Sequence, residues 1–115
     1  MNNVYDSANK LAADIKNSEE YNLYKKARIQ VMSNPELKEK VNNFEKIRYD
    51  MQVLEIEKGQ ESLEKKEKLQ EMYKLLIENK DLKEYFDLEV RFNVMVADIN
   101  KIIAESMEDI FNIKW

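Results

Sequence analysis

The chain has 115 residues, which is the usual size of one domain and enough to bury a modest core. It contains one Gly and one Pro, so the residues that sheets and tight loops use at their turns are almost absent. It has no Cys and no His, which excludes disulfides, thiolate chemistry, and metal sites that need either residue. We therefore predict one all-α domain over residues 1–115, made of about five helices, two of them long.

The net charge of −4 is unevenly distributed along the sequence. Seven acidic and two basic residues fall between Glu84 and Asp109. Such a segment repels phosphate backbones, so we do not expect nucleic acid as a partner. No apolar run approaches the roughly 18 residues that cross a bilayer, and the first residues show no basic region followed by an apolar core. We expect a cytoplasmic protein that does not associate with a membrane.

Two short helices are expected at 3–16 and 19–32. In the first, apolar residues recur every three or four positions and therefore share one helix face. These residues are Val4, Ala8, Leu11, Ala12 and Ile15. Ser18 is a suitable N-cap for the second helix, and the acidic Glu19 and Glu20 favour its positive start. The second helix is expected to bury Tyr21, Tyr24, Ile29 and Met32.

The third helix is expected over 35–58. Asn34 can cap its free N–H groups, and Pro35 at the first helical position lacks the donor that would otherwise be unsatisfied. Gly59 is the natural residue to close the helix in a left-handed conformation. The expected buried stripe is Leu37, Val41, Phe44, Ile47, Met51 and Leu54.

The fourth and fifth helices are expected at 62–78 and 82–111. Asp81 and Glu84 have the spacing of a capping box at the start of the last helix. That helix carries an apolar seam at heptad spacing, wider than one short neighbour could cover. The seam consists of Tyr85, Leu88, Phe92, Met95, Ile99 and Ile102. We predict an antiparallel helical hairpin or bundle that dimerises.

Apolar residues also lie near the end of the chain, among them Phe111 and Trp115. Such residues either dock on the body of the protein or contact a partner, and we favour docking. The candidate interaction surface combines these two residues with the seam of the last helix. Its members are Tyr85, Leu88, Phe92, Met95, Ile99, Ile102, Phe111 and Trp115.

Few residues are candidates for chemistry. Glu89 lies between apolar neighbours, and Glu105 and Asp109 form a carboxylate pair four residues apart, a pattern that solvated helix faces produce often. We therefore expect no catalytic residue, cofactor or metal ion. Of the functional hypotheses, an enzyme that uses these carboxylates has the least support. The basic cluster Lys25, Lys26 and Arg28 supports an alternative, an RNA-associated factor that contacts the phosphate backbone.

A set of packing and turn features runs along nearly the whole chain. It includes Val4-Tyr5-Asp6, Ser18-Glu19-Glu20-Tyr21, Asn34-Pro35-Glu36, Gly59, and Glu89-x-x-Phe92 leading into Ile99-x-x-Ile102-Ile103. In this order the features resemble the YlbF/YmcA family of small helical bacterial proteins, most closely its YheA-like branch. The resemblance implies a cytoplasmic, non-enzymatic protein from a Gram-positive type of bacterium, acting as a dimer or within a hetero-oligomer.

Better-studied members of this family resemble adaptors that act with partner proteins in RNA processing and in competence, sporulation and biofilm formation. The present chain lacks Cys, so an iron–sulfur role cannot be transferred to it. We therefore expect a protein–protein interaction module, a homodimer or a hetero-oligomer with other small helical proteins, with a regulatory adaptor role implied by the resemblance.

Overall fold

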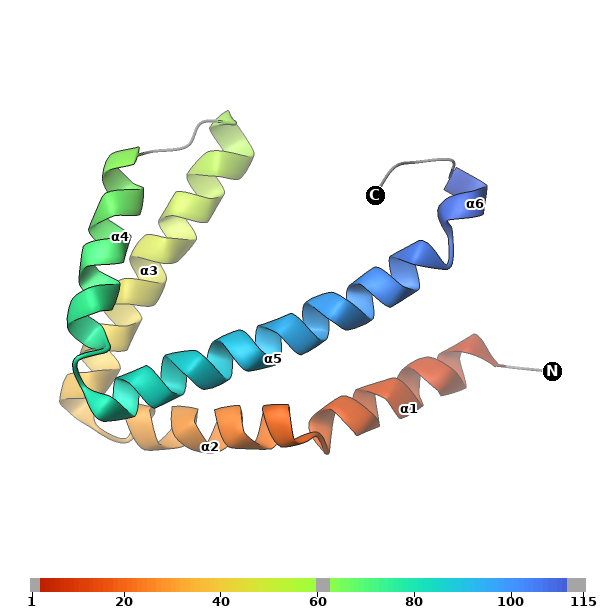
Figure 1. Ribbon diagram of the computed structural model, residues 1–115, viewed down its shortest axis with the longest axis horizontal. Coiled ribbons are helices and arrows are strands. Elements are labelled where there is room, and N and C mark those ends of the chain that lie inside the picture. The colour runs from red at the N-terminus through yellow and green to blue at the C-terminus, as the bar shows by residue number, and fades with distance from the viewer. Residues whose placement is uncertain (1–2, 60–62, 112–115) are drawn as a thin grey trace. The chain divides into compact units, whose positions relative to one another are not determined.

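The computed structural model describes residues 3–59 and 63–111, and this part of the chain is built from helices without any strand (Figure 1). The helices are α1 (Val4–Lys16), α2 (Glu19–Met32), α3 (Pro35–Lys58), α4 (Leu63–Leu76), α5 (Lys80–Glu105) and α6 (Glu108–Phe111). The two long helices, α3 and α5, have 24 and 26 residues. The all-α prediction is confirmed.

The chain divides into two compact units. Unit 1 comprises Met1–Lys26 and Asp87–Trp115, and unit 2 comprises Ala27–Phe86. The boundaries between the units fall inside α2 and α5. The expectation of a single domain over 1–115 stays a prediction.

The start and end of α3 follow directly from its terminal residues. The backbone N–H groups of Glu36 and Leu37 donate to Asn34 Oδ1 at 3.1 and 3.3 Å, and Pro35 occupies the first turn. Gly59 ends the helix with a φ of 62°, a left-handed conformation that a residue with a Cβ rarely adopts. The predicted boundaries 35–58 are confirmed.

The cap of α5 is Asn79, and the prediction of Asp81 was wrong. Asn79 Oδ1 accepts hydrogen bonds from the backbone N–H groups of Asp81 and Leu82 at 2.9 and 3.2 Å. The helix therefore begins at Lys80, earlier than expected. Asp81 then lies in the first turn, where its charge favours the positive helix end.

The predicted continuous helix over 82–111 is interrupted after Glu105. The hydroxyl of Ser106 donates to the carbonyl of Ile103 at 2.6 Å, so it competes with the regular helix bonds. The backbone N–H of Met107 also bonds to a carbonyl three residues earlier, which tightens the last turn. The single turn of α6 follows this break.

Unit 2 contains the apolar core. Its buried apolar residues are Ala27, Val31, Leu37, Val41, Phe44, Leu69, Leu76, Leu82, Tyr85 and Phe86. Here α3 and α4 pack side by side as an antiparallel hairpin (Figure 1). Ile29, which was expected to be buried, is 61% exposed because it lies two positions from both Ala27 and Val31, on the opposite side of α2.

Within the described residues, no helix combines the length and the apolar character that crossing a membrane requires.

The caps of α5 can be tested by comparing Asn79→Ala with Asp81→Ala. Loss of the Asn79 side chain should lower the free energy of unfolding by about 1 kcal/mol, because two N–H groups lose their acceptor. Loss of Asp81 should cost less, roughly 0.3–1 kcal/mol, through the helix dipole alone. Urea unfolding followed by circular dichroism measures both, and the reverse order would restore Asp81 as the cap.

Candidate interaction surface

Unit 1 lacks a buried apolar core among its described residues. Glu89, 7% exposed, is its one buried residue, and α1 has none. Apolar side chains of α1, α2 and α5 are half-buried instead. They are Leu11, Ile15, Tyr21, Tyr24, Leu88, Phe92, Met95, Val96 and Ile99. Because burial of apolar surface is the main driving force for packing, this unit is incompletely covered.

We name the apolar row along this part of α5 the α5 seam, defined as Leu88, Phe92, Met95, Ile99 and Ile102. Its members recur at steps of four, three, four and three residues, and therefore share one side of the helix. Burial of the side chains decreases along the seam. The first four residues are half-buried, whereas Ile102 is 68% exposed. The end of the seam toward Ile102 is therefore the part most open to a partner.

The beginning of the α5 seam is held by aromatic residues of α2. The ring of Phe92 lies 6.1 Å from that of Tyr21 and 5.6 Å from that of Tyr24, measured between centroids. An ion pair between Arg91 and Glu19, at 3.2 Å, joins the same two helices. These contacts fix the position of α5 beside α2 within unit 1.

Three residues of the predicted surface do not form part of the α5 seam. Tyr85 is fully buried in unit 2 and is therefore not part of an exposed surface of this chain. The heptad spacing does place Tyr85 in line with the seam, but neighbours from unit 2 cover it. The side chain of Phe111 and the whole of Trp115 lie outside the described residues.

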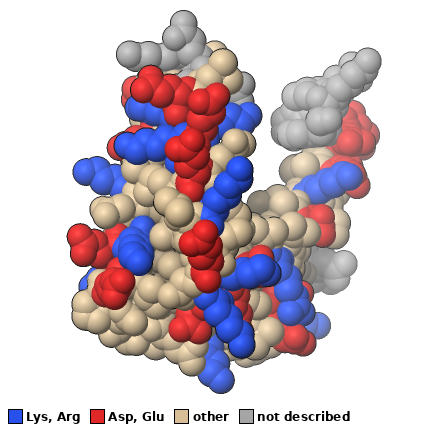
Figure 2. All heavy atoms as spheres, turned by 60° about the vertical axis from the view of Figure 1, so that its left-hand side comes forward, with Lys and Arg blue, Asp and Glu red and all other residues tan. Residues whose placement is uncertain are grey.

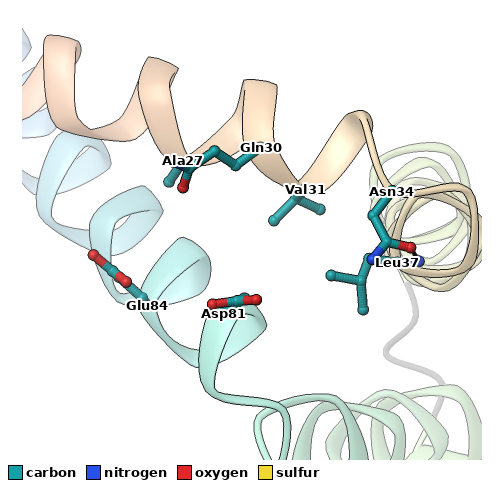
Figure 3. A pocket seen from close by; sticks show the side chains of 7 residues that line it. All are labelled: Ala27, Gln30, Val31, Asn34, Leu37, Asp81 and Glu84. Carbon is teal, nitrogen blue, oxygen red and sulfur yellow. Dashed lines mark hydrogen bonds between the residues drawn. The ribbon is translucent and has the colours of Figure 1, made fainter.

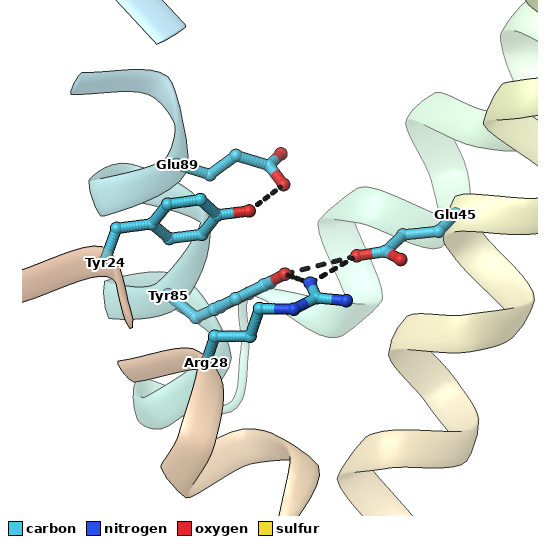
Figure 4. A network of polar contacts seen from close by, with 5 residues as sticks. All are labelled: Tyr24, Arg28, Glu45, Tyr85 and Glu89. Atoms are coloured by element: carbon cyan, nitrogen blue, oxygen red, sulfur yellow. Dashed lines mark hydrogen bonds and ion pairs between the residues drawn. The ribbon is translucent and has the colours of Figure 1, made fainter. Parts of the chain in front are cut away.

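The buried carboxylate of Glu89 is paired with a phenol. The hydroxyl of Tyr24 donates to Glu89 Oε2 at 3.1 Å (Figure 4). A buried carboxylate requires such donors, since it has lost its hydration. The contact joins α2 to α5, and the phenol of Tyr24 supplies one donor to this carboxylate.

The carboxylate pair Glu105 and Asp109 is divided by the break between α5 and α6. Glu105 ends α5 and Asp109 lies in α6, so the two do not occupy neighbouring turns of one helix as predicted. Glu105 instead accepts an ion pair from Lys101 at 3.8 Å. In the part of the chain that the structure describes, no three acidic residues are grouped so that they could hold a metal ion.

The basic cluster on α2 is partly engaged by other side chains. Arg28 forms an ion pair with Glu45 at 3.1 Å and donates to the hydroxyl of Tyr85, which in turn donates to Glu45 at 3.2 Å (Figure 4). Lys25 Nζ lies 5.9 Å from the centre of the Tyr21 ring. Figure 2 shows acidic and basic side chains interleaved over α3 and α4, rather than a continuous basic patch. The RNA alternative stays a prediction.

Unit 2 also contains a cavity of about 310 Å³ that the sequence did not indicate (Figure 3). It is lined by Ala27, Gln30, Val31, Asn34, Leu37, Asp81 and Glu84. Asp81 and Glu84 come from α5, and Ala27, Gln30 and Val31 come from α2 on the other side of the cavity (Figure 3). The lining carries no nucleophile paired with a base, so we assign it no reaction.

The sequence over residues 4–108 matches the family model described as control of competence regulator ComK, YlbF/YmcA. The chain belongs to the YlbF/YmcA family. A UPF0342 protein of Halothermothrix orenii is 38% identical over 105 residues, which cover 91% of this chain and 89% of that protein. A UPF0342 protein of Caldicellulosiruptor bescii is 32% identical over 108 residues, 94% of this chain and 91% of the relative. The resemblance to the YlbF/YmcA family is thereby confirmed.

A solved structure supports the fold of this YlbF/YmcA chain. It is a protein of unknown function (DUF964) from Bacillus stearothermophilus, with a TM-score of 0.78 and 18% identity. The likeness covers 94% of this chain and 95% of the other. At this identity the comparison establishes the helical fold alone.

The pairing of Tyr24 with Glu89 predicts unequal effects of two similar substitutions. Tyr24→Phe removes a hydroxyl that donates to a buried carboxylate and should lower the free energy of unfolding by about 1–3 kcal/mol. Tyr21→Phe is the matched control, because Tyr21 is also half-buried against Phe92 and its hydroxyl forms no hydrogen bond within the described residues. Equal losses in chemical denaturation would contradict a role for the Tyr24 hydroxyl.

Proposed function

We propose that this chain is a non-enzymatic protein–protein interaction module that associates with a second copy of itself through the α5 seam. The observation that carries the proposal is the absence of a buried apolar core among the described residues of unit 1. Burying one fully exposed large aliphatic side chain contributes about 1.5–3 kcal/mol, and a half-buried side chain retains part of this gain. Several half-covered residues along the seam therefore provide a substantial driving force for association.

The spacing of the seam favours a helix as the covering element. Residues at alternating steps of three and four form a row that packs against a similar row on another helix. With 26 residues, α5 is long enough to present this row over several turns. A second copy supplies such a helix, and other small helical proteins are the alternative partners for the same surface.

A regulatory role is the second part of the proposal. The matching family is described by the control of the competence regulator ComK, and a chain that acts by binding is suited to regulation. The carboxylates considered for catalysis support binding rather than chemistry, because Glu89 pairs with a phenol and Glu105 with Lys101. We therefore propose a regulatory adaptor that acts through its protein contacts.

Size-exclusion chromatography with light scattering over a dilution series tests the association. We expect the mass of a dimer at tens of micromolar, falling toward the monomer mass on dilution if exchange is fast. A strictly monomeric chain over the whole series would remove self-association from the proposal. The interaction module would then have to act through a stable complex with another helical protein.

The location of the interface is tested by Ile102→Glu, with Ile29→Glu as a matched control. Both isoleucines are exposed, at 68% and 61%, but only Ile102 belongs to the α5 seam. A buried charge at the interface should weaken the dimer about tenfold to a hundredfold, whereas Ile29→Glu should leave the dissociation constant unchanged. Equal behaviour of the two variants would place the interface elsewhere. Circular dichroism confirms that each variant remains helical.

A further inference from the structure

Helix α1 is held on unit 1 by few contacts. It runs beside the second half of α5 within the same compact unit (Figure 1). None of its 13 residues is buried. Leu11 and Ile15 are half-buried, and every other residue of α1 is exposed. These two side chains are four positions apart and share one face of the helix, so the apolar attachment of α1 depends on this face alone.

The polar and aromatic contacts that hold α2 on α5 do not extend to α1. The ion pair of Arg91 with Glu19 and the bond from Tyr24 to Glu89 both involve α2. Among the described residues, no side chain of α1 forms a hydrogen bond, an ion pair or a ring contact with another helix. Segments with few buried apolar contacts open at a lower free energy than the rest of a protein. Helix α1 is therefore able to open while α2 stays on α5.

The break between α1 and α2 provides the hinge for this opening. Asn17 and Ser18 separate the two helices. The Ser18 hydroxyl accepts from the backbone N–H of Tyr21 at 3.1 Å, which caps the start of α2. The same hydroxyl donates to the carbonyl of Ile15 at 2.6 Å, at the end of α1. Rotation of the backbone at the break therefore moves α1 and leaves the start of α2 capped.

The part of α5 beside α1 belongs to the α5 seam. Tyr21 contacts Phe92, and the segment of α1 and α2 runs opposite in direction to α5. Residues before Tyr21 therefore lie beside residues after Phe92, which include the half-buried Met95 and Ile99. Side-chain surface that contacts α1 is not available to another helix. Helix α1 and a helix of a second copy thus compete for this stretch of the seam.

We propose that α1 is a lid on the α5 seam, which opens at the Asn17–Ser18 break and is replaced on the seam by a second copy. This inference rests on the proposed function and identifies how access to the same surface is controlled. In the closed chain, α1 partly covers the seam, and its opening exposes more apolar surface for association. The affinity of the dimer then depends on the stability of α1, because each copy must release its lid.

Hydrogen exchange of the monomer at low concentration tests the opening. Backbone amides of residues 8–16 should exchange at least about tenfold faster than those of residues 21–32, because α1 opens without the rest of unit 1. Helix α2 is a matched control, since it has 14 residues against 13 in α1. Equal protection of the two helices would mean that they open together and would overturn the lid.

A helix-weakening substitution on the exposed side of α1 tests the competition. Ala13 lies on the face of α1 opposite Leu11 and Ile15. A helix of 13 residues is marginally stable by itself, so we expect the open lid to lose its helix. Ala13→Gly should then destabilise the closed lid about fivefold in each copy and tighten the dimer roughly twentyfold. Gln52→Gly, at an exposed position of α3 in unit 2, is the control and should leave the dissociation constant unchanged.

Light scattering over a dilution series measures both variants. A weaker dimer for Ala13→Gly would mean that α1 is part of the interface, and an unchanged dimer would mean that α1 does not compete with a second copy. Either result would overturn the proposal. If the unmodified chain and the variant both stay monomeric, self-association itself is contradicted, and the competition with it. Hydrogen exchange is measured on the monomer, so it decides separately whether α1 opens.

Discussion

The central constraint on this chain is the unequal distribution of buried apolar surface. Unit 2 has an apolar core in which Tyr85 and Phe86 are almost completely removed from water. The described residues of unit 1 bury a carboxylate and no apolar side chain. Since apolar burial stabilises packed helices, unit 2 has more buried apolar surface to maintain its packing than the described part of unit 1. The proposed association through the α5 seam follows from this imbalance.

Polar contacts have different roles in the two units. In unit 2, Arg28, Glu45 and Tyr85 contact one another at the margin of the apolar core, so they add geometric definition to its packing. In unit 1, the bond from Tyr24 to Glu89 and the ion pair of Arg91 with Glu19 join α2 to α5 where apolar cover is partial.

The sequence predicted features that are set by neighbouring residues and missed those that depend on distant ones. Asn34 and Gly59 define α3 through their own backbone chemistry, and both were predicted correctly. The start of α5 was predicted too late because Asp81 was taken as the cap, although Asn79 is an equally suitable cap residue. Tyr85 was placed on the candidate surface because heptad spacing identifies a helix side but not what covers it. The contact of Tyr24 with Glu89 spans 65 positions, and the spacing of residues along one helix carries no signal for it.

The arrangement of the two units along the chain has a consequence for the order of folding. Unit 2 is one continuous segment, and the α3–α4 hairpin within it brings together residues that are close in sequence. Contacts of this kind have a low entropic cost of loop closure and form rapidly. Unit 1 is assembled from two segments that flank the whole of unit 2. During synthesis the hairpin can therefore form while α1 still awaits α5, so the incompletely covered part of the molecule is also the last to be assembled.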